Sequence, residues 1–265
     1  MTRDALPLGL DVGLVAYDGK AMVAFYQDGL GLPLLDATEL PAGLLTRFAA
    51  GPGVIKINQQ AQTRVERAPG DLTQSRGFKL LTLVVQDLAA TSRNLQTAGF
   101  PALNVQDYSG LAVAFTTDPN NSMVELLADP SIKTPTLRAV GLTVGDLQAS
   151  RTFLTQVLGF SEGKTEPIPG LNTDKVEFAA GTITLKLWQI NDLPSHTGPI
   201  HNYAGIRYLT VRVDDMVSIL SRAQKSGCNV TLAPTQFSPG LHIAMVEDPD
   251  GNWFELAMIE RDRSS

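Results

Sequence analysis

Alternating apolar and polar positions recur at four places along the chain. Runs with this two-residue period begin at Asp11, Leu80, Ala139 and Tyr208. Such alternation is typical of β-strands with one buried face. Each run leads through an aspartate into a helical stretch, and three shorter strand-like runs follow, separated by Gly, Pro and Asn. The pattern predicts a unit of one strand, one helix and three strands, used four times.

Two of the predicted helices, at residues 89–98 and 217–226, carry boundary signals at both ends. An aspartate precedes each helix, and its side chain can accept hydrogen bonds from the free N–H groups of the first turn. A glycine, Gly99 or Gly227, follows each helix and suits the left-handed conformation that ends it. The predicted later strands of the last unit are residues 230–232, 241–246 and 253–258.

The two halves of the chain repeat each other. The turn Leu-Gly-Leu at residues 30–32 has a counterpart, Leu-Gly-Phe, at residues 158–160, which lie 128 positions later. Repeats of this kind indicate duplication of a structural unit. We therefore expect two domains of two units each, at residues 1–132 and 133–265, with a linker at residues 129–135.

Composition narrows the functional class. The net charge of −6 does not favour binding of nucleic-acid phosphates, which basic patches neutralise. No apolar run approaches the ~20 residues of a membrane span, and the first four residues do not resemble a signal peptide. The single cysteine, Cys228, excludes an intramolecular disulfide and a thiolate zinc cluster. We expect a cytoplasmic protein that binds neither nucleic acid nor membrane, and a homodimer stays open.

The closing motif Asp-Pro-Asp-Gly-Asn-Trp-Phe-Glu-Leu at residues 248–256, together with the four units and their Leu-Gly turns, resembles the vicinal oxygen chelate superfamily. Glyoxalase I, bleomycin-resistance proteins, methylmalonyl-CoA epimerase and extradiol dioxygenases belong to it. The resemblance implies an α+β fold in which four βαβββ modules form two half-open mixed-sheet barrels with helices outside. It does not fix the reaction, because this fold hosts lyases, epimerases, oxygenases and plain binders.

Metal-using members of this family take one ligand, His or Gln, from the start of a module's first strand and a second, Glu, from near the end of its last strand. No histidine stands at any of these positions here, and a catalytic metal needs about three protein ligands. We therefore expect no cofactor; a divalent metal is the alternative, with Asp11, Glu125, Tyr208 and Glu255 as weak candidates. The positions are Asp11, Leu80, Ala139 and Tyr208 on first strands, and Lys56, Glu125, Lys186 and Glu255 on last strands.

Each half has one lysine and one glutamate at last-strand positions, 69 residues apart. Pairing of modules within halves would set Lys186 against Glu255. In one interpretation the ammonium replaces the cation of relatives and holds a ligand carboxylate or enolate. In an enzyme, Glu255 would then be the base and Lys186 would stabilise an oxyanion. In the other, the pair is a buried ion pair that only fills the barrel. Pairing of the first module with the fourth would instead bring Asp11, Tyr208 and Glu255 together.

The second half offers the greater variety of candidate ligand-binding side chains. Two cations, one carboxylate and aromatic rings on one cleft would suit an anionic or aromatic compound. Ordinary packing of the aromatic residues within the sheet is the alternative. The expected ligand-binding residues are Lys186, Trp188, Tyr208, Arg212, His242, Trp253 and Glu255.

The sequence therefore predicts a two-domain, glyoxalase/bleomycin-resistance-like protein that binds a small anionic or aromatic molecule in a barrel cleft without metal. A lyase, isomerase or dioxygenase of the vicinal oxygen chelate type, with Glu255 or Glu125 as base or metal ligand, is the alternative. A third hypothesis is an interaction module whose clefts are filled by their own side chains. The volume of the cleft separates this third hypothesis from the other two.

Overall fold

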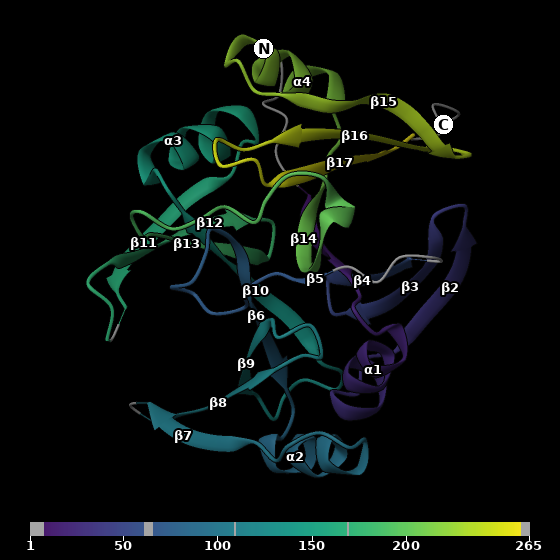
Figure 1. The fold of residues 1–265 in the computed structure, drawn as a ribbon, viewed down its shortest axis with the longest axis vertical. Coiled ribbons are helices and arrows are strands. Elements are labelled where there is room, and N and C mark those ends of the chain that lie inside the picture. The colour runs from purple at the N-terminus through teal and green to yellow at the C-terminus, as the bar shows by residue number, and fades with distance from the viewer. Residues whose placement is uncertain (1–7, 61–65, 109, 169, 261–265) are drawn as a thin grey trace.

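The computed structural model describes residues 8–60, 66–108, 110–168 and 170–260, so the first four residues, whose sequence does not resemble a signal peptide, lie outside it. Four βαβββ modules follow one another, as predicted, and Figure 1 shows α4 and α2 at opposite ends of the molecule, outside the strands. None of the described helices is long and apolar enough to cross a membrane.

Module 1 contains β1 (Gly9–Val15), α1 (Gly19–Val23), the π-helical turn η1 (Ala24–Gly29), β2 (Leu34–Leu40), β3 (Gly43–Ala50) and β4 (Gly53–Gln60), and the short β5 (Glu66–Arg67) follows it. Module 2 contains β6 (Gly77–Val85), α2 (Leu88–Thr97), β7 (Asn104–Tyr108), β8 (Leu111–Thr117) and β9 (Met123–Ala128). Module 3 contains β10 (Thr136–Val144), α3 (Leu147–Thr152), the π-helical turn η2 (Phe153–Val157), β11 (Ser161–Pro167), β12 (Asp174–Ala180) and β13 (Ile183–Gln189). Module 4 contains β14 (Tyr203–Arg212), α4 (Met216–Lys225), β15 (Val230–Ser238), β16 (Leu241–Glu247) and β17 (Trp253–Ile259), and the 3₁₀ turn η3 (Ile200–Asn202) precedes it.

The strands form two mixed sheets, each built from one module of each half. Sheet 1 has the order β15-β16-β17-β14-β1-β4-β3-β2 and joins modules 4 and 1. Sheet 2 has the order β11-β12-β13-β10-β6-β9-β8-β7 and joins modules 3 and 2. The antiparallel pairs β1–β14 and β10–β6 are the two seams. A cleft confined to the second half is therefore wrong, while the boundary between residues 132 and 133 stays a prediction.

The predicted boundaries of α2 and α4 are confirmed to within one residue. Asp87 accepts hydrogen bonds from the backbone N–H groups of Ala89 and Ala90 at 2.7 and 3.1 Å, which caps α2. Asp215 accepts one from Ser218 N at 2.9 Å and caps α4. These bonds satisfy donors that have no partner inside the helix.

The alternation of side chains along the first strands is also confirmed. Val12 and Leu14 on β1 are fully buried in the core that the helices cover. Asp11 on β1, and Tyr208 and Thr210 on β14, point to the opposite face and line a cavity. Successive side chains of a strand point to opposite faces, so the core positions fix which residues reach the cleft.

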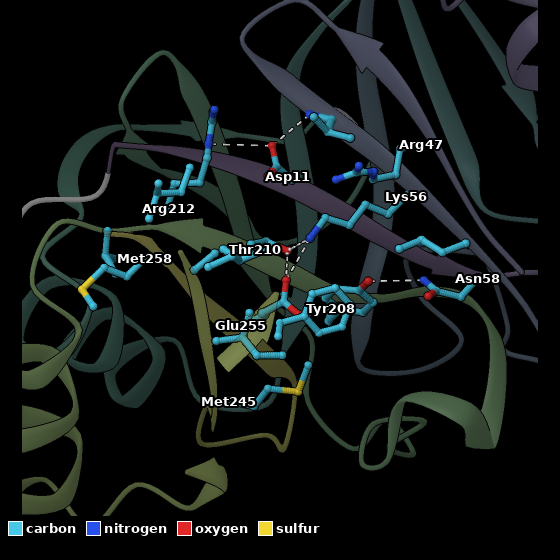
Figure 2. A pocket seen from close by; sticks show the side chains of 18 of the residues that line it. Asp11, Arg47, Lys56, Asn58, Tyr208, Thr210, Arg212, Met245, Glu255 and Met258 are labelled. Atoms are coloured by element: carbon cyan, nitrogen blue, oxygen red, sulfur yellow. Dashed lines mark hydrogen bonds and ion pairs between the residues drawn. The ribbon is translucent and has the colours of Figure 1, made fainter. Parts of the chain in front are cut away.

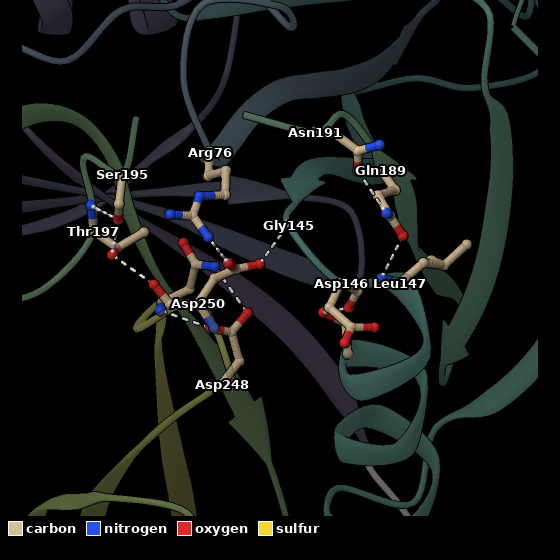
Figure 3. Close-up of polar contacts among 12 residues, drawn as sticks. Arg76, Gly145, Asp146, Leu147, Gln189, Asn191, Ser195, Thr197, Asp248 and Asp250 are labelled. Atoms are coloured by element: carbon tan, nitrogen blue, oxygen red, sulfur yellow. Dashed lines mark hydrogen bonds and ion pairs between the residues drawn. The ribbon is translucent and has the colours of Figure 1, made fainter. Parts of the chain in front are cut away.

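The closing loop before the last strand of each half connects the two sheets, and Figure 3 shows the loop of the second half. Asp250, in the loop before β17, accepts a hydrogen bond from Gly145 N at 2.8 Å and one from Arg76 Nη1 at 2.7 Å. Its counterpart Asn120 accepts from Tyr17 N at 2.9 Å and donates to a carbonyl of β1 at the same distance. Hydrogen bonds of both closing loops thus hold sheet 1 to sheet 2.

Candidate functional site

Sheet 1 surrounds a cavity of about 1340 Å³ (Figure 2). Small-molecule sites usually measure about 300–1,000 Å³, so this cleft is not filled by its own side chains. Charged and polar groups from β1, β4, β14 and β17 line one part of it. The apolar lining includes Leu40, Leu45, Phe237, Ile243, Met245 and Met258.

Three polar side chains from three strands meet in this cavity. Lys56 Nζ on β4 donates to Glu255 Oε1 on β17 at 2.8 Å and to Thr210 Oγ1 on β14 at 2.7 Å. The Thr210 hydroxyl in turn donates to Glu255 Oε1 at 2.6 Å. The Lys56 and Glu255 side chains are 16% and 11% exposed, so water screens their attraction weakly. Burial is the largest single effect and favours the neutral amine, but the charge of Glu255, its hydrogen bond and the other nearby groups together outweigh it, and the pKa of Lys56 lies above its ordinary value.

Tyr208 lies beside this triad and adds a neutral hydroxyl to the cavity. Its ring covers Gly13, where a Cβ atom would lie only 2.0 Å from a ring carbon, so this position requires glycine. The hydroxyl accepts a hydrogen bond from Asn58 Nδ2 at 3.3 Å, and Lys56 Nζ lies 5.6 Å from the ring centroid. Burial raises the pKa of Tyr208, so the phenol stays protonated and can donate to a ligand.

Two arginines and an aspartate also line the cavity, as do Asp214 and Glu260. Asp11 accepts a hydrogen bond from Val54 N at 2.9 Å, and Arg212 Nε lies 3.8 Å from its carboxylate. Burial raises the pKa of Asp11 above its ordinary value. Arg47 forms a two-point ion pair with Asp36. The cations Lys56, Arg47 and Arg212 therefore all have a carboxylate nearby.

Sheet 2 repeats the triad at the equivalent positions. Lys186 Nζ donates to Glu125 Oε2 at 2.9 Å and to Thr82 Oγ1 at 3.0 Å, and Thr82 donates to Glu125 at 2.5 Å. The surroundings differ, because Leu80 and Ala139 replace the polar Tyr208 and Asp11 of sheet 1. The charges were thus retained in both sheets, whereas the neighbouring polar groups were not.

The structure separates the residues that were expected to share one cleft. The expected contact of Lys186 with Glu255 is wrong: Lys186 binds Glu125 in sheet 2, and Lys56 binds Glu255 in sheet 1. Trp188 also belongs to sheet 2, where it is 1% exposed and donates to Thr143 at 2.6 Å. The physical reason is that modules pair across the halves rather than within them.

Tyr208, Arg212 and Glu255, by contrast, line the cavity of sheet 1 together. Trp253 and His242 lie in the same sheet, but they are not among the residues that line this cavity. Trp253 Nε1 donates to Glu247 at 2.8 Å, and His242 Nε2 lies 2.7 Å from a carboxylate oxygen of Glu260.

Several lining residues were missing from the expected ligand-binding set. Lys56 was recognised as a family position but was not expected in this cleft, whereas Asp11 was expected beside Tyr208 and Glu255 if module 1 pairs with module 4, which is the pairing observed. Asn58, Thr210 and Met245 were not among the expected ligand-binding residues. The two-residue period already places Thr210 on the same face as Tyr208 and Arg212. For the residues of module 1, the missing information was which module completes the sheet.

The donor set does not fit a divalent metal. The family's metal positions in sheet 1 are Asp11, Lys56, Tyr208 and Glu255, and the ammonium of Lys56 already binds the glutamate that would be a ligand. Nowhere in the described ranges do three His, Cys, Asp or Glu side chains come together in a way that could hold a metal ion. A cation among these groups would meet an ammonium at hydrogen-bonding distance from Glu255, which like-charge repulsion opposes.

Paired βαβββ modules around a cleft lined from first and last strands define the vicinal oxygen chelate fold. The sequence profile of the Glyoxalase/Bleomycin resistance protein/Dioxygenase superfamily matches residues 11–126 and 136–256, and the chain belongs to this superfamily. No curated protein matches it in sequence.

Solved structures support the fold. Glyoxalase I from Zea mays shares 18% sequence identity, with a TM-score of 0.73 over 96% of this chain and 92% of the maize chain. A dioxygenase-like protein from Bacillus subtilis shares 16%, with a TM-score of 0.70 over 97% of this chain and 86% of its own. The cppA protein from Streptococcus pneumoniae shares 11%, with a TM-score of 0.59 over 97% of this chain and all of its own. At such identities the likeness concerns the fold alone.

Proposed function

We propose that this protein binds a small organic molecule with an apolar body and an anionic or phenolic group in the cleft of sheet 1, without a metal. The observation that carries the proposal is the open cavity of about 1340 Å³ with a fixed ammonium group among its lining residues. Large apolar pockets with a few converging polar groups are the usual form of small-molecule sites.

The chemistry of the lining supports this class of ligand. An ammonium group has three N–H donors, and Lys56 uses two of them within the described residues. Arg212 Nε is buried and has no hydrogen-bond partner there. Both groups can donate to a ligand oxygen, while Met245, Met258 and Ile243 supply apolar contact for the rest of the molecule.

The test is a screen of aromatic and medium-chain aliphatic carboxylic acids by isothermal titration calorimetry. We expect saturable binding that Ala257→Trp abolishes, because Ala257 lines the cavity and an indole would fill it. The matched control is Leu127→Trp at the equivalent position of sheet 2, which should bind as the wild type does. Lys56→Met should weaken acids about tenfold or more, since a hydrogen bond to a charged group contributes about 1.5–3 kcal/mol. Lys186→Met should not.

Two outcomes would contradict the proposal. Binding that survives Ala257→Trp, with the variant's fold verified by circular dichroism, would place the ligand elsewhere. Conversion of a bound acid to a product, detected by mass spectrometry and lost in Glu255→Gln, would favour the enzymatic alternative over a binding protein.

A further inference from the structure

We infer that the ammonium group of Lys56 is a built-in replacement for a divalent cation at the centre of sheet 1, so that this cleft works without a metal. The inference concerns the same cleft as the proposed function. It stands on its own, because metal binding can be measured with no organic ligand present.

The strand register places Lys56 in a symmetric set of four. Asp11 on β1 lies opposite Thr210 on β14, which lies beside Glu255 on β17. Gly13, two residues after Asp11, lies between Lys56 on one side and Tyr208 on the other. Asp11 and Tyr208 therefore hold equivalent places on the two central strands, and Lys56 and Glu255 hold equivalent places on the two flanking strands. At these equivalent places module 1 has the ammonium group of Lys56 and module 4 has the carboxylate of Glu255.

The ammonium makes the contacts that a cation at this centre would make. It lies 2.8 Å from Glu255 and 2.7 Å from the Thr210 hydroxyl, and both partners offer it oxygen atoms. The carboxylate of Asp11 also favours its charge at longer range. A covalently attached cation of this kind cannot be removed by chelation, and its unused N–H is available to a ligand oxygen.

The contacts between a lysine, a threonine and a glutamate occur in sheet 2 as well as in sheet 1, so the lysine of sheet 1 is not an isolated substitution. The three contacts of its triad agree with those of sheet 1 to within 0.3 Å. The duplication has thus kept the lysine, the threonine and the glutamate together. Because Leu80 and Ala139 offer no oxygen or nitrogen donor, sheet 2 is also a natural control for sheet 1.

The experiment is a titration of chelator-washed protein with Mn²⁺ alone, in which electron paramagnetic resonance reports the free ion. The wild type should take up no stoichiometric Mn²⁺. Lys56→Glu should acquire one site per chain, about tenfold or more tighter than any wild-type binding, because carboxylate oxygens suit this ion. Its melting temperature should then rise with Mn²⁺, since an ion that binds the folded state stabilises it. Lys186→Glu makes the same charge change in sheet 2 and should gain no such site.

One equivalent of Mn²⁺ on the wild type, lost in Glu255→Gln, would overturn the inference. Equal behaviour of Lys56→Glu and Lys186→Glu would also overturn it, because the central position would then have no special donor set. If Lys56→Glu does not fold, Lys56→Gln removes the ammonium with less repulsion and should still bind more Mn²⁺ than the wild type. A wild type that binds neither Mn²⁺ nor any acid would contradict the proposed function and leave this inference intact.

Discussion

At the scale of single residues, two equivalent aspartates of the closing loops, Asp248 and Asp118, are buried. Asp248 accepts hydrogen bonds from the backbone N–H groups of Asp250 and Asn252 at 2.9 and 2.7 Å, and from the Asn252 side chain at 2.8 Å. Burial nevertheless raises the pKa of Asp248 to about 7. Burial also raises the pKa of its counterpart Asp118, to about 6. Loss of water around the carboxylate outweighs the hydrogen bonds that favour its charge.

These pKa values predict that Asp248 destabilises the fold as pH rises. A folded-state pKa above the unfolded value of 3.8 gives stability that is present below pH 3.8 and is lost as pH rises through about 7. The rise corresponds to about 4 kcal/mol at most. Between pH 4 and pH 7 the wild type loses this stability and Asp248→Asn does not. The free energy of unfolding of the variant relative to the wild type should therefore rise over this range and stay constant at higher pH. Urea titrations at several pH values measure this.

The equivalent variant Asp118→Asn provides the comparison. The free energy of unfolding of this variant relative to the wild type should stop rising near pH 6, because the pKa of Asp118 is lower than that of Asp248. A difference between wild type and Asp248→Asn that stays constant from pH 4 to pH 8 would show that Asp248 does not titrate in this range.

At the scale of secondary-structure elements, the closing loops decide how the sheets are joined. Asp250 is 5% exposed at its side chain and reaches both the end of β10 and the residue before β6. In the first half the neutral amide of Asn120 joins the two sheets by hydrogen bonds with Tyr17 N and with a carbonyl of β1. The hydrogen bond to a strand end is common to both loops, whereas the ion pair with Arg76 belongs to one.

This difference predicts unequal effects of two substitutions at Asp250. Asp250→Ala leaves Gly145 N without a partner and should lower the free energy of unfolding by about 1–3 kcal/mol. Asp250→Asn can still accept from Gly145 N, as Asn120 accepts from Tyr17 N, so it should cost less, about 1 kcal/mol or below, because Arg76 is partly exposed. Chemical denaturation of both variants measures the difference. Equal losses would mean that the ion pair, and not the strand contact, contributes the stability.

At the scale of the whole molecule, the two sheets need both halves of the chain. β1 of the first half pairs with β14 of the second, and β6 pairs with β10 in the same way. A half on its own has two modules but neither of these seams. Its central strands would expose edges that readily pair with another chain.

We therefore predict that residues 1–132 and residues 133–265 do not fold as separate monomers but fold when mixed. Each fragment alone should show no cooperative melting as a monomer, or should self-associate through its modules. The equimolar mixture should give one 1:1 complex with a cooperative transition. Light scattering after size-exclusion chromatography and thermal circular dichroism measure both properties. A fragment of residues 1–132 that melts cooperatively as a monomer would contradict this prediction.

The sequence by itself determined the repeating parts of this protein. Two-residue alternation depends only on which positions are buried, so it placed Asp11, Tyr208 and Thr210 on one face of their strands. The caps at Asp87 and Asp215 act on neighbouring N–H groups, so local sequence was enough to locate α2 and α4. The duplication was visible for the same reason, because each module repeats the same local requirements.

Only the tertiary structure decided which modules meet. Modules so similar in pattern can pair within a half or across halves, and no local signal distinguishes the two. The pairing across halves gives Glu255 to Lys56 and Glu125 to Lys186, and it divides the expected cleft between two sheets. The candidate site depends on contacts between residues up to 199 positions apart. Hydrogen bonds between distant strands, which sequence periodicity does not encode, determine those contacts.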